Sequence, residues 1–273
     1  MNGSSGDAAD RGVGDRLQAG LDAALAAGRA ALRRFGDAAL LVELKGDRSP
    51  VTAADREAET SLREALLTRF PRDGFLGEEF GAVDGSSGYE WVVDPIDGTK
   101  SFIRGVPLWA TLVGCRRHGV GVLGVVVIPA LDEVVYAARD GGAWHAVGSG
   151  SPTRARVSQR ETLRSSLACS SDFTSFVRRA DPLAGASARA GIEEAFQIVR
   201  TWGDGYGYLL VATGRAEAMI DPLMNPWDAA AVEVVVAEAG GRFSDWSGRS
   251  RIDGGDGVAT NGRIHEAVVR LLG

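Results

Sequence analysis

Cysteine and histidine are scarce in this sequence of 273 residues. It holds two cysteines, Cys115 and Cys169, and three histidines, His118, His145 and His265. Each cysteine lies in an apolar stretch, as a reduced core residue does, and the pair does not form a disulfide framework. No histidine lies near a cysteine cluster, which argues against a structural zinc site. Any metal ion that this chain binds is therefore expected to have oxygen ligands.

Long apolar runs and an excess of basic residues are absent as well. No run approaches the roughly 20 apolar residues that span a membrane, and the start of the chain, MNGSSGDAADRGVGD, lacks the basic-then-apolar pattern of a signal peptide. We interpret residues 1–14 as a disordered tail and expect a cytoplasmic protein. The net charge of −6 and the pI near 5.2 argue against a basic nucleic-acid surface. We therefore expect neither a nucleic acid nor a membrane as a partner.

The predicted elements alternate between helices and strands. Hydrophobic residues make up 45% and charged residues 24% of the chain, an ordinary balance for a globular protein. Mixed sheets covered by helices are expected, with an N-terminal α+β half (15–150) and a C-terminal α/β half (151–273), because the composition changes at AVGSGSPTRARVS. The predicted helices are 15–35, 53–70, 192–198, 206–213, 227–239 and 264–272, and the predicted strands are 90–93, 108–115, 120–128, 167–171 and 216–221, with a hairpin over 133–146 and short strands near 242 and 258.

The segment EWVVDPIDGTK ends an apolar run with two aspartates. Asp94 and Asp97 are three residues apart, so they would not share one face of a regular strand. Pro95 predicts a turn, which can aim both carboxylates into one space, and Gly98 with Thr99 can then begin a helix whose free N–H groups attract an anion. This is the outline of a magnesium-dependent phosphate site. Asp-Pro and Asp-Gly pairs are equally typical of a plain acidic turn.

Three further acidic features each have a simple structural explanation. Glu78 and Glu79 follow an apolar Phe-Leu pair and fit a solvated loop. Asp228 lies in the first turn of an almost wholly apolar helix, where the helix dipole favours a negative charge. Thr52 and Asp55 have the spacing of a capping box. These separate explanations do not account for the occurrence of all three features in one chain with DPIDGT.

The ordered set KGDRSPVTAAD, GEE, DPIDGT and WDAAAVEVVVAEAGG resembles the inositol monophosphatase superfamily of metal-dependent, lithium-sensitive phosphatases. The resemblance covers nearly everything after the first dozen residues. It implies a layered αβαβα sandwich of the inositol monophosphatase/fructose-bisphosphatase type, and a homodimer. Within the superfamily, SFIRGVPLWATLVG and RTWGDGYGYLLVATGRAEAMIDP are most similar to histidinol-phosphate phosphatases. The implied reaction converts L-histidinol phosphate and water to L-histidinol and phosphate, a step of histidine biosynthesis.

The resemblance also implies roles for individual residues. Two or three magnesium ions are implied, which neutralise the phosphate and activate a water molecule that attacks phosphorus directly, without a phosphoenzyme. Asp97 and the backbone N–H groups of Gly98 and Thr99 are implied to bind the substrate. The implied metal ligands are Glu78, Asp94, the carbonyl of Ile96, Asp97 and Asp228, and the residues implied to orient the water are Thr99, Glu78, Asp55 and Glu79.

Asp204 and Asp221 are the residues that we expect to select the leaving group. Histidinol carries an amine and an imidazole, so carboxylates favour it over a neutral polyol. Trp109 or Trp202 is expected to pack against its ring, although a buried aromatic residue more often belongs to the core. Two positions depart from the superfamily pattern. Ser101 replaces the usual asparagine, and Asp221 stands where many members carry a glutamate.

Two other functions stay open. One is an inositol-1-phosphate or broad sugar-phosphate phosphatase, against which Trp109 and Asp204 speak. The other is a metal-binding regulatory module that has lost turnover, against which the complete set of acidic ligands and Thr99 speaks. In either enzymatic case the predicted substrate is a small-molecule phosphate monoester.

Overall fold

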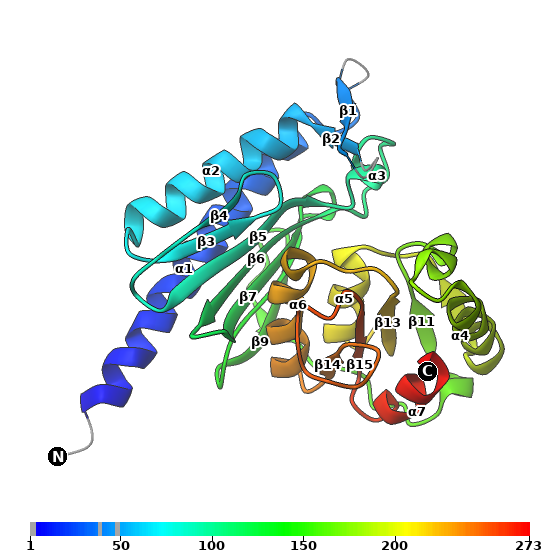
Figure 1. Cartoon of the computed structure of the whole chain (residues 1–273). Coiled ribbons are helices and arrows are strands. Elements are labelled where there is room, and N and C mark those ends of the chain that lie inside the picture. Colours follow the sequence, from blue (N-terminus) through cyan, green and yellow to red (C-terminus); the bar gives the residue numbers. More distant parts are fainter. Residues whose placement is uncertain (1–3, 38–39, 47–49) are drawn as a thin grey trace.

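The computed structural model of the chain describes residues 4–37, 40–46 and 50–273. Five layers alternate through the molecule: two helices, a sheet, two helices, a second sheet and two outer helices (Figure 1). This arrangement confirms the predicted αβαβα sandwich. The layers contain α1 (Ser4–Leu32) and α2 (Ala53–Arg69), then α5 (Gly205–Ala212) and α6 (Pro226–Glu238), then α4 (Pro182–Ala195) and α7 (His265–Leu272).

The first sheet has eight strands in the order β10-β9-β8-β7-β6-β5-β3-β4. Its neighbouring strands are antiparallel, apart from β3 and β5, which run parallel. From β5 to β9 each strand pairs with the next along the chain, as short connections favour. The strands are β3 (Gly74–Gly77), β4 (Gly81–Val83), β5 (Tyr89–Asp97), β6 (Ala110–Arg117), β7 (Val120–Ile128), β8 (Glu133–Ala138), β9 (Gly142–Val147) and β10 (Thr153–Arg154).

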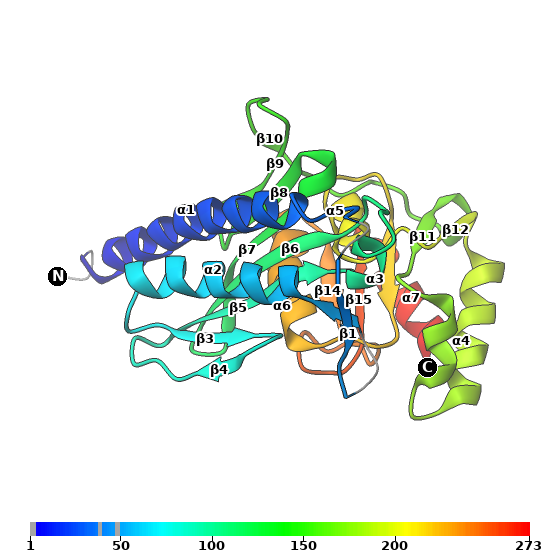
Figure 2. The same cartoon turned by 90° about the horizontal axis from the view of Figure 1, so that it is seen from above.

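The second sheet is smaller and mixes both pairing directions. Its order is β12-β11-β13-β15-β14. Strand β11 is parallel to β12 and β13, whereas β15 is antiparallel to β13 and β14. A separate two-stranded ribbon, β1 with β2, lies near the short helix α3 (Figure 2). The bounds are β11 (Leu167–Cys169), β12 (Ile198–Arg200), β13 (Ala218–Asp221), β14 (Arg242–Ser244), β15 (Gly257–Thr260), β1 (Val42–Leu44), β2 (Pro50–Thr52), α3 (Thr99–Phe102) and the 3-10 helices η1 (Pro129–Leu131), η2 (Leu163–Ser165) and η3 (Phe173–Arg178).

Helix α6 lies between the two sheets, which explains why it is apolar on all sides. Its alanines and valines, apart from the exposed Ala237, are buried against β5, β6 and β7 of the first sheet and β14 and β15 of the second. The first sheet approaches closely because it carries glycines there. A Cβ atom on Gly124 of β7 would lie 2.1 Å from the carbonyl oxygen of Ala231. This packing holds the start of α6, and with it Asp228, beside the end of β5.

Two predicted helices have different bounds in the structure. Helix α1 begins at Ser4 instead of residue 15, so residues 4–14 are helical and do not form the expected tail, and residues 1–3 lie outside the described residues. A helix that is already formed extends at little cost, and no proline interrupts this segment. The helix predicted over 192–198 ends at Ala195, because Ile198 begins β12 and pairs with β11.

The predicted division after residue 150 stays a prediction. Strand β10, at Thr153–Arg154, still pairs with the first sheet, and the second sheet begins at Leu167. No helix of the described residues is both long enough and apolar enough to cross a bilayer.

Candidate active site

Asp94 and Asp97 lie on the last residues of β5. The pairing of β5 with β6 shifts in register between them, and such a bulge redirects side chains, so residues three apart can converge. The carbonyl of Pro95 accepts a hydrogen bond from the hydroxyl of Thr111 (2.9 Å), and the N–H of Ile96 donates to Oδ1 of Asp94 (3.0 Å). The turn expected at Pro95 is therefore wrong, and a bulged strand aims the two carboxylates.

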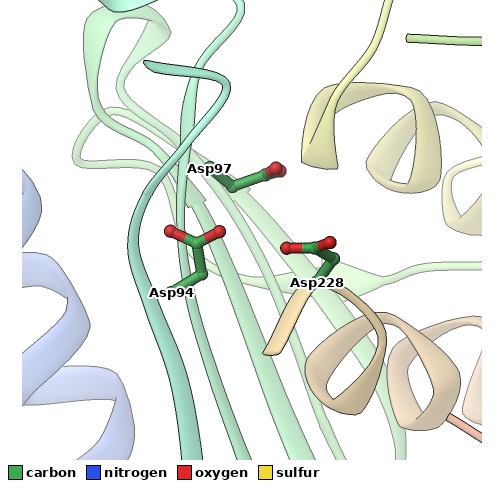
Figure 3. A group of neighbouring side chains, drawn as sticks. All are labelled: Asp94, Asp97 and Asp228. Carbon is green, nitrogen blue, oxygen red and sulfur yellow. The ribbon is translucent and has the colours of Figure 1, made fainter. Parts of the chain in front are cut away.

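Asp228 reaches the same place from the first turn of α6. Its Oδ2 accepts the backbone N–H of Asn225 (2.7 Å), which closes a capping box at the helix start. One carboxylate oxygen from each of Asp94, Asp97 and Asp228 lies within 4.8 Å of the others. Figure 3 shows the three side chains pointing toward one another. The cap explanation for Asp228 is thus compatible with a metal-ligand role.

Burial makes this aspartate cluster electrostatically unfavourable on its own. Burial and then repulsion from Glu78 raise the pKa of Asp94 well above its usual range, and burial with repulsion from Asp204 does the same for Asp97. Burial is also the main cause that raises the pKa of Asp228 to about 7. A hard cation with oxygen ligands stabilises such a set, and magnesium has this preference. The donor set therefore fits magnesium.

Glu78 and Glu79 follow β3 and are held by a cation and a buried acid. The Nζ atom of Lys45 donates to Oε1 of Glu78 (2.7 Å) and to Oε1 of Glu79 (2.6 Å). The buried carboxylate of Glu59, on α2, accepts the backbone N–H groups of Glu79 (2.6 Å) and Phe80 (3.0 Å). The solvated-loop explanation is therefore wrong, because these contacts fix the segment.

Thr99 begins α3 and contacts Asp55 across the site. Its Oγ1 lies 3.2 Å from Oδ1 of Asp55 and 3.2 Å from the carbonyl oxygen of Ile96, and its single proton can be donated to either acceptor. The other oxygen of Asp55 accepts the backbone N–H (2.8 Å) and hydroxyl (2.6 Å) of Thr52, so the predicted capping box is confirmed. Gly98 precedes α3 with a φ of 84°, a conformation that favours glycine. Asp55 therefore caps α2 and contacts Thr99 at once.

A cavity of about 240 Å³ adjoins the aspartate cluster. It lies where the end of β5 meets elements of the C-terminal half, and five aspartates line it together with Lys100 and Arg178. Asp97 and Asp228 of the cluster line the cavity. The C-terminal half contributes further lining residues, among them Ser171, Asp172, Asp204 and Asp221. A ligand in this cavity would contact the cluster and these carboxylates together.

Asp204 and Asp221 both line this cavity, but they are bound differently. Asp221 accepts the backbone N–H of Ser171 on Oδ1 and the hydroxyl of Tyr208 on Oδ2, both at 2.9 Å. Burial raises the pKa of Asp221 to about 6. Burial also raises the pKa of Asp204, against the opposing effects of Ser171 and of the Lys100 charge. With both oxygens of Asp221 occupied, Asp204 is the better placed of the two to contact a ligand.

Trp109 does not reach the cavity, contrary to expectation. Its side chain is fully buried, and its ring packs edge-on against Phe102 (4.9 Å between centroids) and beside Phe35 (5.8 Å). Trp109 is not among the described residues that line the cavity. The predicted substrate contact is therefore wrong, and Trp109 belongs to the aromatic core between α1 and α3.

Sequence reasoning missed several residues of the site. Lys45 stands in the motif KGDRSPVTAAD, yet nothing local signals that its ammonium group pairs with Glu78 and Glu79. Glu59 lies on a helix face like any solvated glutamate. Asp172 and Tyr208 belong to segments whose position depends on the second sheet. Only the tertiary arrangement brings these side chains to the site.

The chain matches the model of the inositol monophosphatase family over residues 15–272. Histidinol-phosphatase of Mycobacterium tuberculosis is 42% identical over 240 residues, 88% of this chain and 90% of the relative. Histidinol-phosphatase of Chlorobaculum parvum is 38% identical over 94% of this chain and 96% of the relative. A solved structure, extragenic suppressor protein suhB from Bartonella henselae, superposes with a TM-score of 0.84 at 30% identity and covers 94% of this chain and 97% of its own. The chain therefore belongs to the inositol monophosphatase family.

Proposed function

We propose that this chain is a histidinol-phosphatase, which hydrolyses L-histidinol phosphate to L-histidinol and phosphate. As a member of its family, the chain is a metal-dependent phosphoric monoester hydrolase. The observation that carries the choice of substrate is the carboxylate of Asp204, which lines the cavity beside the aspartate cluster, with Asp221 next to it. Carboxylates favour a leaving group that carries an amine and an imidazole. Two similar relatives, from Mycobacterium tuberculosis and Chlorobaculum parvum, are histidinol-phosphatases, which supports the same substrate.

The aspartate cluster is proposed to hold two or three magnesium ions. Asp94, Asp97 and Asp228 would supply carboxylate oxygens, joined by Glu78 and by the carbonyl of Ile96. A carbonyl oxygen has two lone pairs, so the Ile96 carbonyl, which lies 3.2 Å from Oγ1 of Thr99, can bind a metal ion beside that hydroxyl. Magnesium, when bound, supplies positive charge that neutralises phosphate oxygens and lowers the pKa of water.

Thr99 and Asp55 are proposed to orient the attacking water and to accept its proton. The Thr99 hydroxyl donates to Oδ1 of Asp55, so its lone pairs are available to a water molecule. As the water attacks phosphorus, Oγ1 of Thr99 takes the water's proton and passes its own to Oδ1 of Asp55. Burial raises the pKa of Asp55, which makes it a better proton acceptor. Glu78 and Glu79, which both accept a hydrogen bond from Lys45, are proposed to help Thr99 and Asp55 orient the water.

The start of α3 is proposed to bind the phosphate. The backbone N–H groups of Gly98 and Thr99 precede the first hydrogen bonds of the helix, and among residues 4–37, 40–46 and 50–273 they have no acceptor. Asp97 lies directly before them, and its Oδ2 accepts the N–H of Gly205 from the C-terminal half. This contact joins the phosphate-binding segment to the segment that carries Asp204.

An inositol phosphate or another sugar phosphate is the alternative substrate. The burial of Trp109 removes one of the two features that argue against it, so Asp204 is the remaining feature. A regulatory module without turnover is the second alternative. The convergence of Asp94, Asp97 and Asp228 argues against that function, because a site without turnover does not need all three carboxylates.

Phosphate release by the purified protein with magnesium tests the proposal. The substrates to compare are histidinol phosphate, inositol 1-phosphate, fructose 1,6-bisphosphate and adenosine 3′,5′-bisphosphate. We expect a large kcat/KM preference for histidinol phosphate. A flat profile, or one led by inositol 1-phosphate, would overturn the substrate and keep the hydrolytic mechanism. No release from any ester, despite magnesium binding, would favour the regulatory module.

We also propose a cytoplasmic homodimer that lithium inhibits, with the chain divided into halves at residues 150 and 151. Membership of the inositol monophosphatase family supports the homodimer and the lithium inhibition, and the change of composition at AVGSGSPTRARVS supports the division. Light scattering of the purified protein measures the oligomeric state, and phosphate release at increasing lithium concentration measures the inhibition. A monomer by scattering, or turnover that lithium leaves unchanged, would contradict the corresponding proposal.

A further inference from the structure

Asp172 is an acidic residue of the cavity that neither the metal-ligand set nor the leaving-group pair includes. It is half-buried, and it precedes η3 as its N-cap. Its Oδ1 accepts both the backbone N–H (2.8 Å) and the hydroxyl (2.7 Å) of Thr174. Within the described residues, Oδ2 of Asp172 has no hydrogen bond or ion pair. One oxygen thus fixes the carboxylate in place and the other stays available.

Asp172 and Asp204 differ in the direction in which their surroundings shift the carboxyl pKa. Partial burial raises the pKa of Asp172, but the hydrogen bonds from Thr174 and the charges of Lys100 and Arg178 outweigh it, so the pKa lies below its usual value. Asp172 is therefore ionised throughout the neutral range. Burial raises the pKa of Asp204 instead. The cavity therefore has a permanently charged carboxylate at Asp172 and a more deeply buried one at Asp204.

Two cations near Asp172 do not neutralise it by direct contact. Lys100 and Arg178 also line the cavity, and both side chains are exposed to solvent. In the part of the chain that the structure describes, neither forms an ion pair with Asp172. Long exposed side chains move at little cost, whereas the Asp172 carboxylate is held by Thr174. A ligand cation can therefore take the position opposite Oδ2.

We propose that Asp172 is a further specificity-determining residue, whose Oδ2 binds the amine or imidazolium of a cationic leaving group while Asp204 binds its other polar end. This inference rests on the proposed function. It assigns the recognition of positive charge to two carboxylates from different segments, the N-cap of η3 and the residue before α5. Asp221 holds Ser171, the neighbour of Asp172, through the Ser171 backbone N–H, so it positions this segment.

Charge-changing variants of the holoenzyme test the proposal. Asp172→Asn keeps an oxygen that can cap η3 and removes only the charge. We expect its KM for histidinol phosphate to rise about tenfold to thirtyfold, with a smaller change in kcat, because Lys100 and Arg178 then repel the substrate cation. Arg178→Gln removes one of those cations, and we expect it to lower the same KM about twofold to threefold. Asp253→Asn, which removes an exposed charge paired with Arg251, is the matched control.

The outcomes separate a recognition role from a structural one. A rise in KM for Asp172→Ala without a rise for Asp172→Asn would overturn the proposal, because only the cap would then matter. An equal rise for histidinol phosphate and for glycerol 2-phosphate, which has a neutral leaving group, would also overturn it. A lower histidinol phosphate to glycerol 2-phosphate ratio of kcat/KM in Asp172→Asn would support it.

A wrong assignment of histidinol phosphate as the substrate can be distinguished from a wrong assignment of Asp172. If wild-type protein hydrolyses other esters but not histidinol phosphate, the proposed function fails by itself. The role of Asp172 is then tested in two ways. One is the ratio of kcat/KM for phosphoethanolamine to that for glycerol 2-phosphate, and the other is the inhibition of glycerol 2-phosphate hydrolysis by added histidinol. A rise in the histidinol inhibition constant in Asp172→Asn would support recognition of the cation, and an unchanged constant would overturn it.

Discussion

The hydroxyl of Thr99 donates to Oδ1 of Asp55 at 3.2 Å, while Oδ2 of Asp55 accepts the N–H and hydroxyl of Thr52. One carboxylate therefore joins the start of α2 to the start of α3. The aspartate cannot rotate away without breaking the cap of α2. This arrangement fixes the position of Thr99 and Asp55, the two residues that we propose to orient the attacking water.

Asp55→Asn is expected to lower kcat by about 10²-fold to 10³-fold, as the loss of a proton acceptor does. The change in KM should stay within about threefold, because Asp55 is not proposed to contact the leaving group. Steady-state kinetics on histidinol phosphate with magnesium make the measurement, with Asp253→Asn as the control. A variant that loses affinity but keeps kcat would show that Asp55 acts only as a helix cap.

Asp94→Asn is expected to abolish turnover and to change thermal stability in two opposite ways. Without metal, the variant should melt at a higher temperature than wild type, because one of several buried like charges is gone. With magnesium, the wild type should gain about 2.7 kcal/mol at a hundredfold excess over Kd, and the variant much less. Thermal melts with and without magnesium make the comparison. Full turnover in the variant would refute the metal-ligand assignment.

Asp204→Ala is expected to change the selectivity of the site more than its chemistry. The ratio of kcat/KM for histidinol phosphate to that for inositol 1-phosphate should fall about tenfold or more, because a carboxylate opposite a cationic group is lost. Asp204→Asn, which keeps the size of the side chain, should lower the ratio in the same direction. Equal losses on both substrates would mean that Asp204 supports the site without selecting the leaving group.

Gly98→Ala is expected to destabilise the protein and to impair turnover. A side chain at this φ of 84° is strained, and the added Cβ would lie 2.5 Å from Oδ2 of Asp204. Gly105→Ala is a matched control, because its φ is 70° and no atom lies within 4 Å of the added Cβ. Both variants should lose about 1 kcal/mol of stability from backbone strain. Only Gly98→Ala should also lose activity, and equal kinetics would remove Gly98 from the site.

His265 is expected to make the protein less stable in mild acid. Its ring lies buried between the hydroxyls of Ser244 and Thr260, both at 3.0 Å, and burial lowers the pKa of His265 to about 4. The unfolded chain, with a histidine pKa near 6.5, binds the proton more readily, so stability falls as pH drops from about 6.5 toward 4. Between pH 7 and pH 5 the loss is about 2 kcal/mol.

Urea unfolding of wild type and His265→Gln at both pH values measures this contribution. Other titrating groups, including the aspartate cluster, affect both proteins alike and cancel in the difference. The variant should lose less stability than the wild type on acidification. An equal loss would show that the His265 ring is as easily protonated in the fold as in the unfolded chain.

Local patterns were enough to predict most elements and the acidic motifs. The periods of helix and strand appear within a few residues, so α2, β7 and α6 were predicted close to their observed bounds. The capping spacing of Thr52 and Asp55 is also a local property, and the structure confirms it. The family resemblance rests on such short ordered motifs, and the family model confirms it.

Contacts between distant segments decided the rest, since no local pattern encodes them. The bulge in β5 depends on pairing with β6, and it brings Asp94 and Asp97 together with Asp228 from another layer. Packing between α1 and α3 buried Trp109, which apolar neighbours alone could not distinguish from a ligand contact. The pairing of Lys45 with Glu78 and the place of Asp172 in the cavity depend on chain segments that meet only after folding. Residue chemistry was therefore readable from the sequence, whereas the choice of partner for each residue required the tertiary structure.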